Sequence, residues 1–165
     1  MRATLSQVMT RGVETTSSAA TLEEAAKKMR VHNIGFLPVV DDHKVVGVIT
    51  DRDIVIRAVC GMFRPEMVRV REVMTPELIA CYEDEGITKA SFLMEKNLIH
   101  RLVVLDRRER LAGVVSLSDI AAKTRYAHVL AKREERETTV RPAMTPVRSA
   151  DSSDPDAHLG HCGAE

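Results

Sequence analysis

The chain repeats itself once, and this duplication constrains its fold more than any other feature. Residues 32–54 return, with the same order of apolar runs and polar turns, as residues 97–120. Within them Leu37–Val40 is matched by Leu102–Leu105, 65 positions later. Two copies in the same order indicate a duplicated supersecondary unit. We therefore expect two small units of one fold.

The second copy carries one extra residue. Asp53 is matched by Asp119, 66 positions later, whereas the matches before the turn differ by 65. The extra residue falls within 106–110, a polar segment between two apolar runs. Turns tolerate insertions because they lie on the surface. The position of the insertion therefore supports the alignment of the two copies.

In each copy the pattern predicts a helix, a β-hairpin and a second helix. Thr21 and Glu24 have the spacing of a capping box, so a helix should begin there, whereas the equivalent Gly86 offers a poorer cap. Short valine-rich runs joined by polar turns are typical of hairpin strands. We expect helical turns at 5–9 and 70–74, strands at 36–40, 44–50, 101–105 and 111–116, and later helices at 54–60 and 120–137.

The predicted fold class is mixed α/β (α+β). A small sheet with helices on one face buries little apolar surface alone, so the two copies should pack sheet against sheet about a pseudo-twofold axis. We assign repeat 1 to 1–62, a linker to 63–69, and repeat 2 with a long C-terminal helix to 70–137. Residues 138–165 lack apolar periodicity and are expected to be a disordered tail.

The composition argues against nucleic-acid and membrane partners. The chain of 165 residues has 24 Lys and Arg and 24 Asp and Glu, so it has no overall basic field. It has no Trp, three Phe and two Tyr, which leaves few rings for stacking on bases. No stretch approaches the roughly 20 apolar residues of a membrane helix, and residues 1–12 lack the apolar core of a secretory signal. We expect a cytoplasmic, soluble protein.

The sequence lacks the residue patterns of a catalytic centre. It has no nucleophile set beside a histidine and a carboxylate, no Walker loop and no GxGxxG motif. Cys60, Cys81 and Cys162 have no CxxC spacing, which argues against a disulfide framework or a zinc knuckle. His158 and His161 lie near Cys162 without a fourth ligand, so only adventitious metal binding is expected there. We expect a non-catalytic protein with no required cofactor and no metal.

A second motif recurs where the hairpin leads into the helix. It has the form Gly-apolar-apolar-Thr/Ser-x-x-Asp and comprises Gly47, Thr50 and Asp53, then Gly113, Ser116 and Asp119. One interpretation is helix capping, which contributes about 1 kcal/mol. The other is a ligand site, because only one of the two side chains is needed as a cap and a carboxylate at a strand end can accept hydrogen bonds from ribose hydroxyls.

The order of these motifs resembles a tandem pair of CBS domains (the cystathionine β-synthase repeat), also called a Bateman module. The resemblance rests on Val8–Thr10, Thr21–Met29, His32–Asp41 and Lys44–Ile54, followed by a second round, and covers roughly residues 1–130. It implies two β-α-β-β-α repeats, two candidate adenine-nucleotide clefts and pairing of two chains as a homodimer.

The second repeat resembles the last repeat of the γ subunit of AMP-activated protein kinase. The resemblance lies in Ile99–Asp106 and Gly113–Asp119. It implies that a histidine and an arginine contact phosphate while the aspartate of the other repeat holds ribose. For cleft A the resemblance implies the ligand-binding residues Thr50, Arg52, Asp53, Leu78, Ile79, His100 and Arg101.

Cleft B departs from this pattern. The resemblance implies the residues Thr10, Val13, Ile34, Gly35, Phe36, Ser116 and Asp119. Gly35 and Phe36 stand where cleft A has His100 and Arg101, so we expect cleft B to lack a cation for phosphate. Cleft A should bind more tightly, because a charge-assisted contact contributes roughly 1.5 to 3 kcal/mol.

Several residues keep a purely structural interpretation. His100 and Arg101 could form a solvated helix exit, Arg52 could pair with Asp51 or Asp53, and Phe36 could belong to the core or to a dimer interface. The leading prediction is a sensor of AMP, ADP or ATP that acts on a separate target protein. The alternatives are an oligomeric interaction module without a physiological nucleotide, or a module that binds NAD or S-adenosylmethionine.

Overall fold

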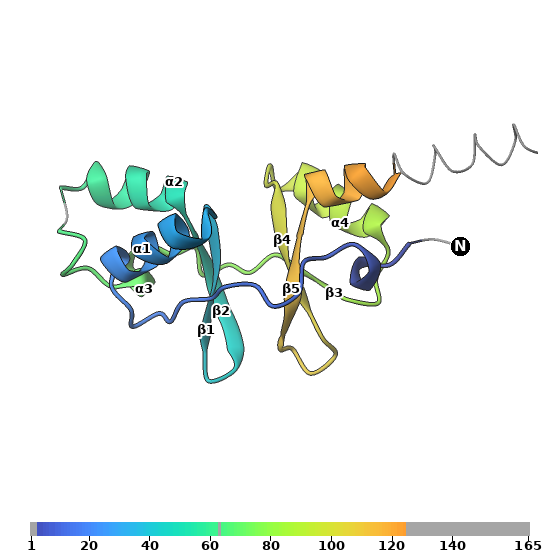
Figure 1. The fold of residues 1–165 in the computed structure, drawn as a ribbon, viewed down its shortest axis with the longest axis horizontal. Helices are drawn as coiled ribbons and strands as arrows, with labels where there is room; N and C mark the ends of the chain where they lie inside the picture. The colour runs from blue at the N-terminus through green and yellow to red at the C-terminus, as the bar shows by residue number, and fades with distance from the viewer. Residues whose placement is uncertain (1–2, 63, 125–165) are drawn as a thin grey trace, which may run out of the picture. The chain divides into compact units, whose positions relative to one another are not determined.

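A computed structural model describes residues 3–62 and 64–124, all of which belong to one compact unit (Figure 1). The first half contains η1 (Leu5–Gln7), α1 (Leu22–His32), β1 (Phe36–Asp41), β2 (Lys44–Thr50), α2 (Asp51–Asp53) and the π-helical η2 (Ile54–Val59). The second contains α3 (Val70–Val73), β3 (Ala80–Tyr82), α4 (Ile87–Lys96), β4 (Arg101–Leu105) and β5 (Leu111–Ser116). Residues 117–124 are helical. The mixed α/β class and the four hairpin strands are therefore confirmed.

The first long helix begins at a capped position, whereas its counterpart α4 does not. Thr21 and Glu24 form the predicted capping box: the Glu24 amide donates to Thr21 Oγ1 at 3.2 Å, and the Thr21 amide donates to Glu24 Oε2 at 2.8 Å. Gly86, at the start of α4, has no side-chain cap, as expected. The two later helices begin at residues 51 and 117, three residues before the predicted starts. The end predicted at 137 and the predicted tail lie outside the described residues.

Each half contains an antiparallel hairpin with the same register irregularity. Phe36 pairs with Thr50 in β1–β2, and Arg101 pairs with Ser116 in β4–β5. In the second half β3 adds a third strand parallel to β4, whereas in the first half this strand is reduced to a single bridge between Thr16 and Val39. The sequence did not predict β3, which has only three residues and depends on pairing with a distant strand.

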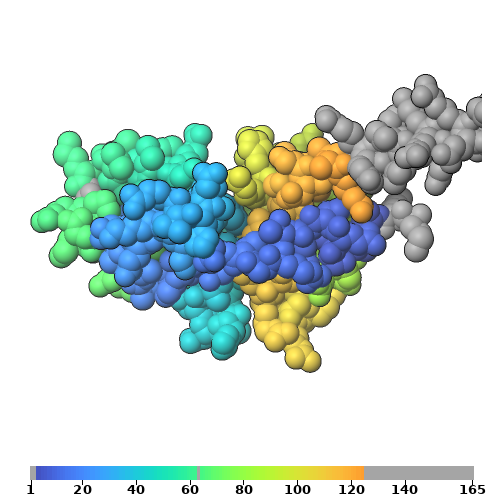
Figure 2. Space-filling view, in the orientation of Figure 1, coloured from blue at the N-terminus to red at the C-terminus, as the bar shows by residue number. Residues whose placement is uncertain are grey.

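The two halves exchange their leading segments. Leu5, from the N-terminal arm, is fully buried in the core of the second half, with Cys81 and Val115. Val70 and Val73 of α3 are buried in the core of the first half. Figure 2 shows the arm (dark blue) across the second half (yellow and orange). Each half is therefore completed by the segment that precedes the other half in the sequence.

Two glycines allow the exchanged segments to cross the hairpins. The backbone of Thr75 bridges to Val48 of β2, and a Cβ placed on Gly47 would lie 2.6 Å from the Thr75 carbonyl oxygen. On the other side, Gly113 of β5 lies under the Thr10 carbonyl in the same way. A contact this close excludes a side chain. The repeated glycine of the motif therefore serves chain crossing.

Among residues 3–62 and 64–124, no helix is both long and apolar enough to cross a membrane. The cytoplasmic location stays a prediction.

Candidate functional site

A cavity of about 370 Å³ lies between the two halves and corresponds to cleft A. Six of the seven predicted residues line it, from β2, α2, the start of β4 with the residue before it, and the segment before β3: Thr50, Arg52, Asp53, Ile79, His100 and Arg101. Leu78 does not line the cavity, although its neighbour Ile79 does. The structure therefore brings a carboxylate of one repeat and a basic pair of the other to one space. That volume is within the usual range for small-molecule sites.

Thr50 and Asp53 form a reciprocal cap at the start of α2. The Asp53 amide donates to Thr50 Oγ1 at 3.1 Å, while Asp53 Oδ2 accepts from the Thr50 amide at 3.0 Å and from the Thr50 hydroxyl at 2.7 Å. The expectation that only one of the two side chains serves as the cap is therefore wrong. A carboxylate has about four lone-pair sites, so Asp53 keeps acceptor capacity on Oδ1 for a ligand.

Arg57, which the sequence argument missed, supports this carboxylate. Its guanidinium lies 3.4 Å from Asp53 Oδ1 and donates to the Val73 carbonyl at 2.7 Å and the Met74 carbonyl at 3.1 Å. Arg57 thus ties Asp53 to the segment that crosses from the second half. The i,i+4 spacing of Asp53 and Arg57, at the start of the helix predicted over 54–60, was the available signal.

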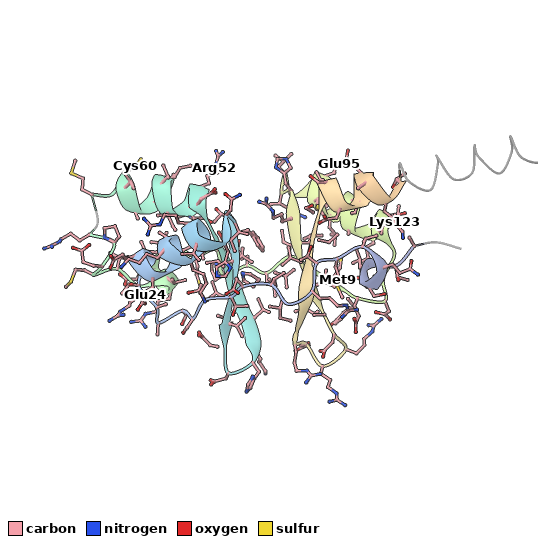
Figure 3. The ribbon with its side chains drawn as sticks, in the orientation of Figure 1. Met9, Glu24, Arg52, Cys60, Glu95 and Lys123 are labelled. Atoms are coloured by element: carbon pink, nitrogen blue, oxygen red, sulfur yellow. The ribbon has the colours of Figure 1, made fainter. Side chains whose placement is uncertain are left out.

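Arg52 and Arg101 provide positive charge for cleft A, and His100 adds an imidazole. Arg52 lies in the first turn of the helical segment that begins at residue 51 (Figure 3). Among the described residues Arg52 forms no ion pair with Asp51 or Asp53, contrary to one interpretation of the sequence. His100 and Arg101 are exposed where the chain enters β4, and the His100 carbonyl accepts from the Leu117 amide at 3.1 Å.

Two acidic residues in cleft A were not predicted. Asp51 and Glu77 line the cavity together with Asp53. The Asp51 carboxylate lies over Gly35, where any Cβ would collide with it, and the Asp51 amide donates to the Gly35 carbonyl at 3.2 Å. Cleft A therefore presents three carboxylates against Arg52, His100 and Arg101. The sequence signal that could have indicated Asp51 was its position between Thr50 and Asp53 of the repeated motif.

A second cavity, of about 290 Å³, corresponds to cleft B. All seven predicted residues line it: Thr10, Val13, Ile34, Gly35, Phe36, Ser116 and Asp119. The Ser116 hydroxyl and amide donate to Asp119 Oδ2 at 2.6 and 2.8 Å, which repeats the cap of cleft A.

The expectation that cleft B lacks a cation is wrong. Arg101 lines cleft B as well as cleft A. Glu14, another residue that the sequence argument missed, also lines cleft B, and its carboxylate lies 3.7 Å from Lys28 Nζ and 3.8 Å from His32 Nε2. Lys28 also donates to the Thr15 carbonyl at 2.7 Å, and neither Lys28 nor His32 lines the cavity. Cleft B thus receives its guanidinium from the same half as Ser116 and Asp119.

The two repeats exchange their leading segments, and a ligand-sized cavity lies on each side of the axis that relates them. This arrangement defines a two-repeat binding module. The CBS domain family model matches residues 5–59 and 70–125. The chain therefore belongs to the CBS domain family, in which a pair of domains forms a regulatory module. The likeness of the second repeat to the kinase γ subunit is not shown by these comparisons and stays a prediction.

The chain is also similar to individual proteins. It is 39% identical over 113 residues to the CBS domain-containing protein YhcV of Bacillus subtilis, covering 68% of this chain and 79% of YhcV. The structure of the CBS domain pair of protein MJ0100 in complex with 5′-methylthioadenosine and S-adenosylmethionine has a TM-score of 0.68 and 30% identity, covering 75% of this chain and 97% of that one. The structure of a hexameric CBS-CP12 protein from bloom-forming cyanobacteria has a TM-score of 0.66 and 28% identity. The match covers 73% of this chain and 67% of that one.

Proposed function

We propose that this chain is a non-catalytic regulatory sensor that binds an adenine nucleotide in cleft A. The observation that carries the proposal is the convergence, in one cavity, of the capped carboxylate of the first repeat and the basic pair of the second. Asp53 comes from the first half, whereas His100 and Arg101 come from the second. A ligand that contacts all three groups would therefore bind where the halves meet.

The lining of cleft A matches the parts of a nucleotide. Asp53 would accept hydrogen bonds from the ribose hydroxyls, with Thr50 and Arg57 holding its orientation. The apolar residues Ile79 and Val48 would contact adenine. Val48 would thus take the role that was expected of Leu78 from the sequence. Arg52, His100 and Arg101 would contact phosphate, because a guanidinium makes charge-assisted and often bidentate hydrogen bonds to phosphate oxygens.

The charges of cleft A favour a short phosphate chain. The carboxylates of Asp51, Asp53 and Glu77 offset the positive charge of Arg52 and Arg101. Each further phosphate adds negative charge, whereas the described lining holds no additional Lys or Arg. We therefore expect AMP to bind more tightly than ADP, and ADP more tightly than ATP, in the absence of a divalent cation.

Binding would act through a change in the populations of two arrangements of the halves. A nucleotide that bridges Asp53 of one half and Arg101 of the other has differential affinity for the arrangement in which these groups converge. A ligand can shift the equilibrium only by this difference in affinity. The altered geometry would then be recognised by a separate target protein.

We further propose a homodimer through the exposed apolar face of η2. Val55, Ile56 and Val59 are 56%, 51% and 60% exposed, although each is aliphatic. Grouped aliphatic side chains of this kind on a surface helix mark an interaction site. Sedimentation equilibrium tests this, with a concentration-independent monomer as the contrary result.

S-adenosylmethionine is the second candidate ligand. The MJ0100 domain pair was crystallised with this compound, and its sequence is 30% identical to that of the present chain over the matched residues. The carboxylates of Asp51 and Glu77 would suit the sulfonium and amino groups of such a ligand, whereas they would disfavour a triphosphate. This observation makes it a necessary competitor in any binding assay.

Equilibrium titration with AMP, ADP, ATP, NAD and S-adenosylmethionine tests the proposal. The double variant Asp53→Ala with Arg101→Ala should weaken AMP binding at least about tenfold, the equivalent of about 1.4 kcal/mol. The matched control is Asp84→Ala with Arg107→Ala, which removes an acid and an arginine joined at 2.6 Å outside both cavities. Unchanged affinity in the first variant would remove cleft A as the site. A flat titration with a stable dimer would instead favour the interaction module.

A further inference from the structure

Arg101 lies at the boundary between the two clefts. It lines both cavities, as does Phe36. Phe36 begins β1 and Arg101 begins β4, 65 positions later, so the two are equivalent positions of the repeats. The pseudo-twofold axis relates them, and each cleft therefore receives both residues. One of the equivalent positions carries a positive charge and the other carries an aromatic ring.

The backbone fixes Arg101 beside cleft B, although its side chain also lines cleft A. Arg101 pairs with Ser116, a cleft B residue, in the β4–β5 register. Thr50, a cleft A residue, pairs with Phe36 in the same way. Arg101 therefore enters the boundary from the cleft B strand and contributes to the lining of cleft A across the axis.

The two clefts depend on this guanidinium to different extents. Cleft A is also lined by Arg52 and His100, whereas Arg101 is the only Lys or Arg among the described residues that line cleft B. Within residues 3–62 and 64–124, the Arg101 side chain forms no ion pair or hydrogen bond with the protein, so a ligand need not displace a partner. An anion in either cleft can therefore recruit it.

We infer that the two clefts compete for Arg101, so that a phosphate-bearing ligand in one cleft lowers the affinity of the other for phosphate. This inference rests on the proposed function, because it requires that nucleotides occupy the clefts. One guanidinium can form a bidentate contact with only one phosphate at a time. The coupling is reciprocal, since each ligand changes the affinity of the other by the same factor.

Ligands with and without a phosphate distinguish competition for Arg101 from a general conformational change of the protein. Adenosine has the base and the ribose of AMP but no phosphate, so it does not recruit the guanidinium. Two adenosine molecules should therefore bind without this coupling, whereas two AMP molecules should bind with it. At saturation with AMP, cleft A holds Arg101, because Arg52 and His100 add to its affinity, and cleft B is filled only at higher concentration.

Titration calorimetry of the full chain with AMP tests the inference, with methyl NMR signals of Ile79 and Val114 reporting cleft A and cleft B separately. In the wild-type chain cleft B fills as the second step. In Asp53→Ala, which weakens cleft A, Arg101 is released and cleft B should bind AMP at least about tenfold more tightly than in that second step. Adenosine should show no such gain. Arg101→Gln should remove the gain, leaving cleft B equally weak whether or not cleft A is occupied.

Arg52→Gln is the matched control, because Arg52 lines only cleft A and its loss removes the same charge. Arg52→Gln should weaken the binding of AMP to cleft A. Because Arg101 is retained, cleft B should still bind AMP and adenosine with different affinities. Equal affinity of cleft B for AMP in the wild-type chain and in Asp53→Ala would overturn the inference and leave the sensor function standing. Absence of AMP binding in both clefts would overturn the inference and the proposed function together.

Discussion

Truncation of Leu5 should loosen the second half of the molecule rather than the first, to which it is adjacent in the sequence. Leu5 is fully buried beside Cys81, Met94 and Val115. Leu5→Ala removes three carbon atoms, each contributing about 0.8 kcal/mol when buried, and leaves a cavity. The free energy of unfolding should fall by about 2 to 5 kcal/mol. The core of the second half should open correspondingly more often.

Cys81 reports this opening directly, because it lies in the same apolar cluster and is 2% exposed. In a background with Cys60→Ser and Cys162→Ser, Cys81 is the only thiol of the chain. Its alkylation then requires an opening of the second half. A loss of about 2 kcal/mol should accelerate this alkylation roughly 30-fold. Urea unfolding of the same variants gives the global free energy for comparison.

Val70→Ala is the control, because Val70 is equally buried but belongs to the core of the first half. It should lower the global free energy of unfolding by a smaller amount and leave the native-state alkylation of Cys81 nearly unchanged. The exchange of leading segments would be refuted if Val70→Ala accelerated this alkylation more than Leu5→Ala. An unchanged rate in Leu5→Ala would refute it equally.

Two further predictions concern stability. Thr21→Ala should lower the free energy of unfolding by about 1 kcal/mol in urea titrations, because it removes the acceptor of the Glu24 amide, whereas Thr21→Ser should be nearly neutral. Burial, with the Glu85 carboxylate, raises the pKa of the Cys81 thiol from 9.0 to about 11. The folded chain thus keeps this proton where the unfolded chain loses it. Stability should therefore be independent of this group below pH 9 and fall by about 1 to 3 kcal/mol towards pH 11, and Cys81→Ala should flatten that part of the profile.

The hairpins could be predicted because their signal is local. Each strand pair is a valine-rich run, a polar turn and a second run, and the duplication gave two independent views of the pattern. The early starts of the helices at residues 51 and 117 were missed for a related reason. Helix capping by Thr50 and Asp53 was one of the two interpretations of the motif, yet the predicted helices were begun only after the carboxylate, because a single side chain was taken to be the cap.

The exchange of segments could not be predicted from the sequence. Leu5 and Val70 lie at equivalent positions of two similar repeats, so each would fit either core by size and polarity. The glycines under the crossing segments, Gly47 and Gly113, occur in both copies, so the choice is made by the packing of each core as a whole. β3 escaped prediction for the same reason, because its pairing partner lies more than 20 residues away in the sequence.

The clefts show a similar division between local and distant information. The motif residues Asp53 and Asp119 line separate cavities, because each is fixed by its own strand and helix. The double role of Arg101 required a structure, since a sequence alignment assigns each position to a single copy. An alignment of repeats lists equivalent residues but does not show which of them lie close to the axis.

Duplication within one chain makes this arrangement possible. In a symmetric pair of identical repeats, the two axis positions would carry the same residue and the two clefts would be identical. Here Phe36 and Arg101 differ, yet each lines both clefts, so a substitution at either position changes both sites at once. Arg52 and His100 line only cleft A, and a substitution there changes one site alone. Residues at the axis therefore determine what the two clefts share, and residues away from it determine how they differ.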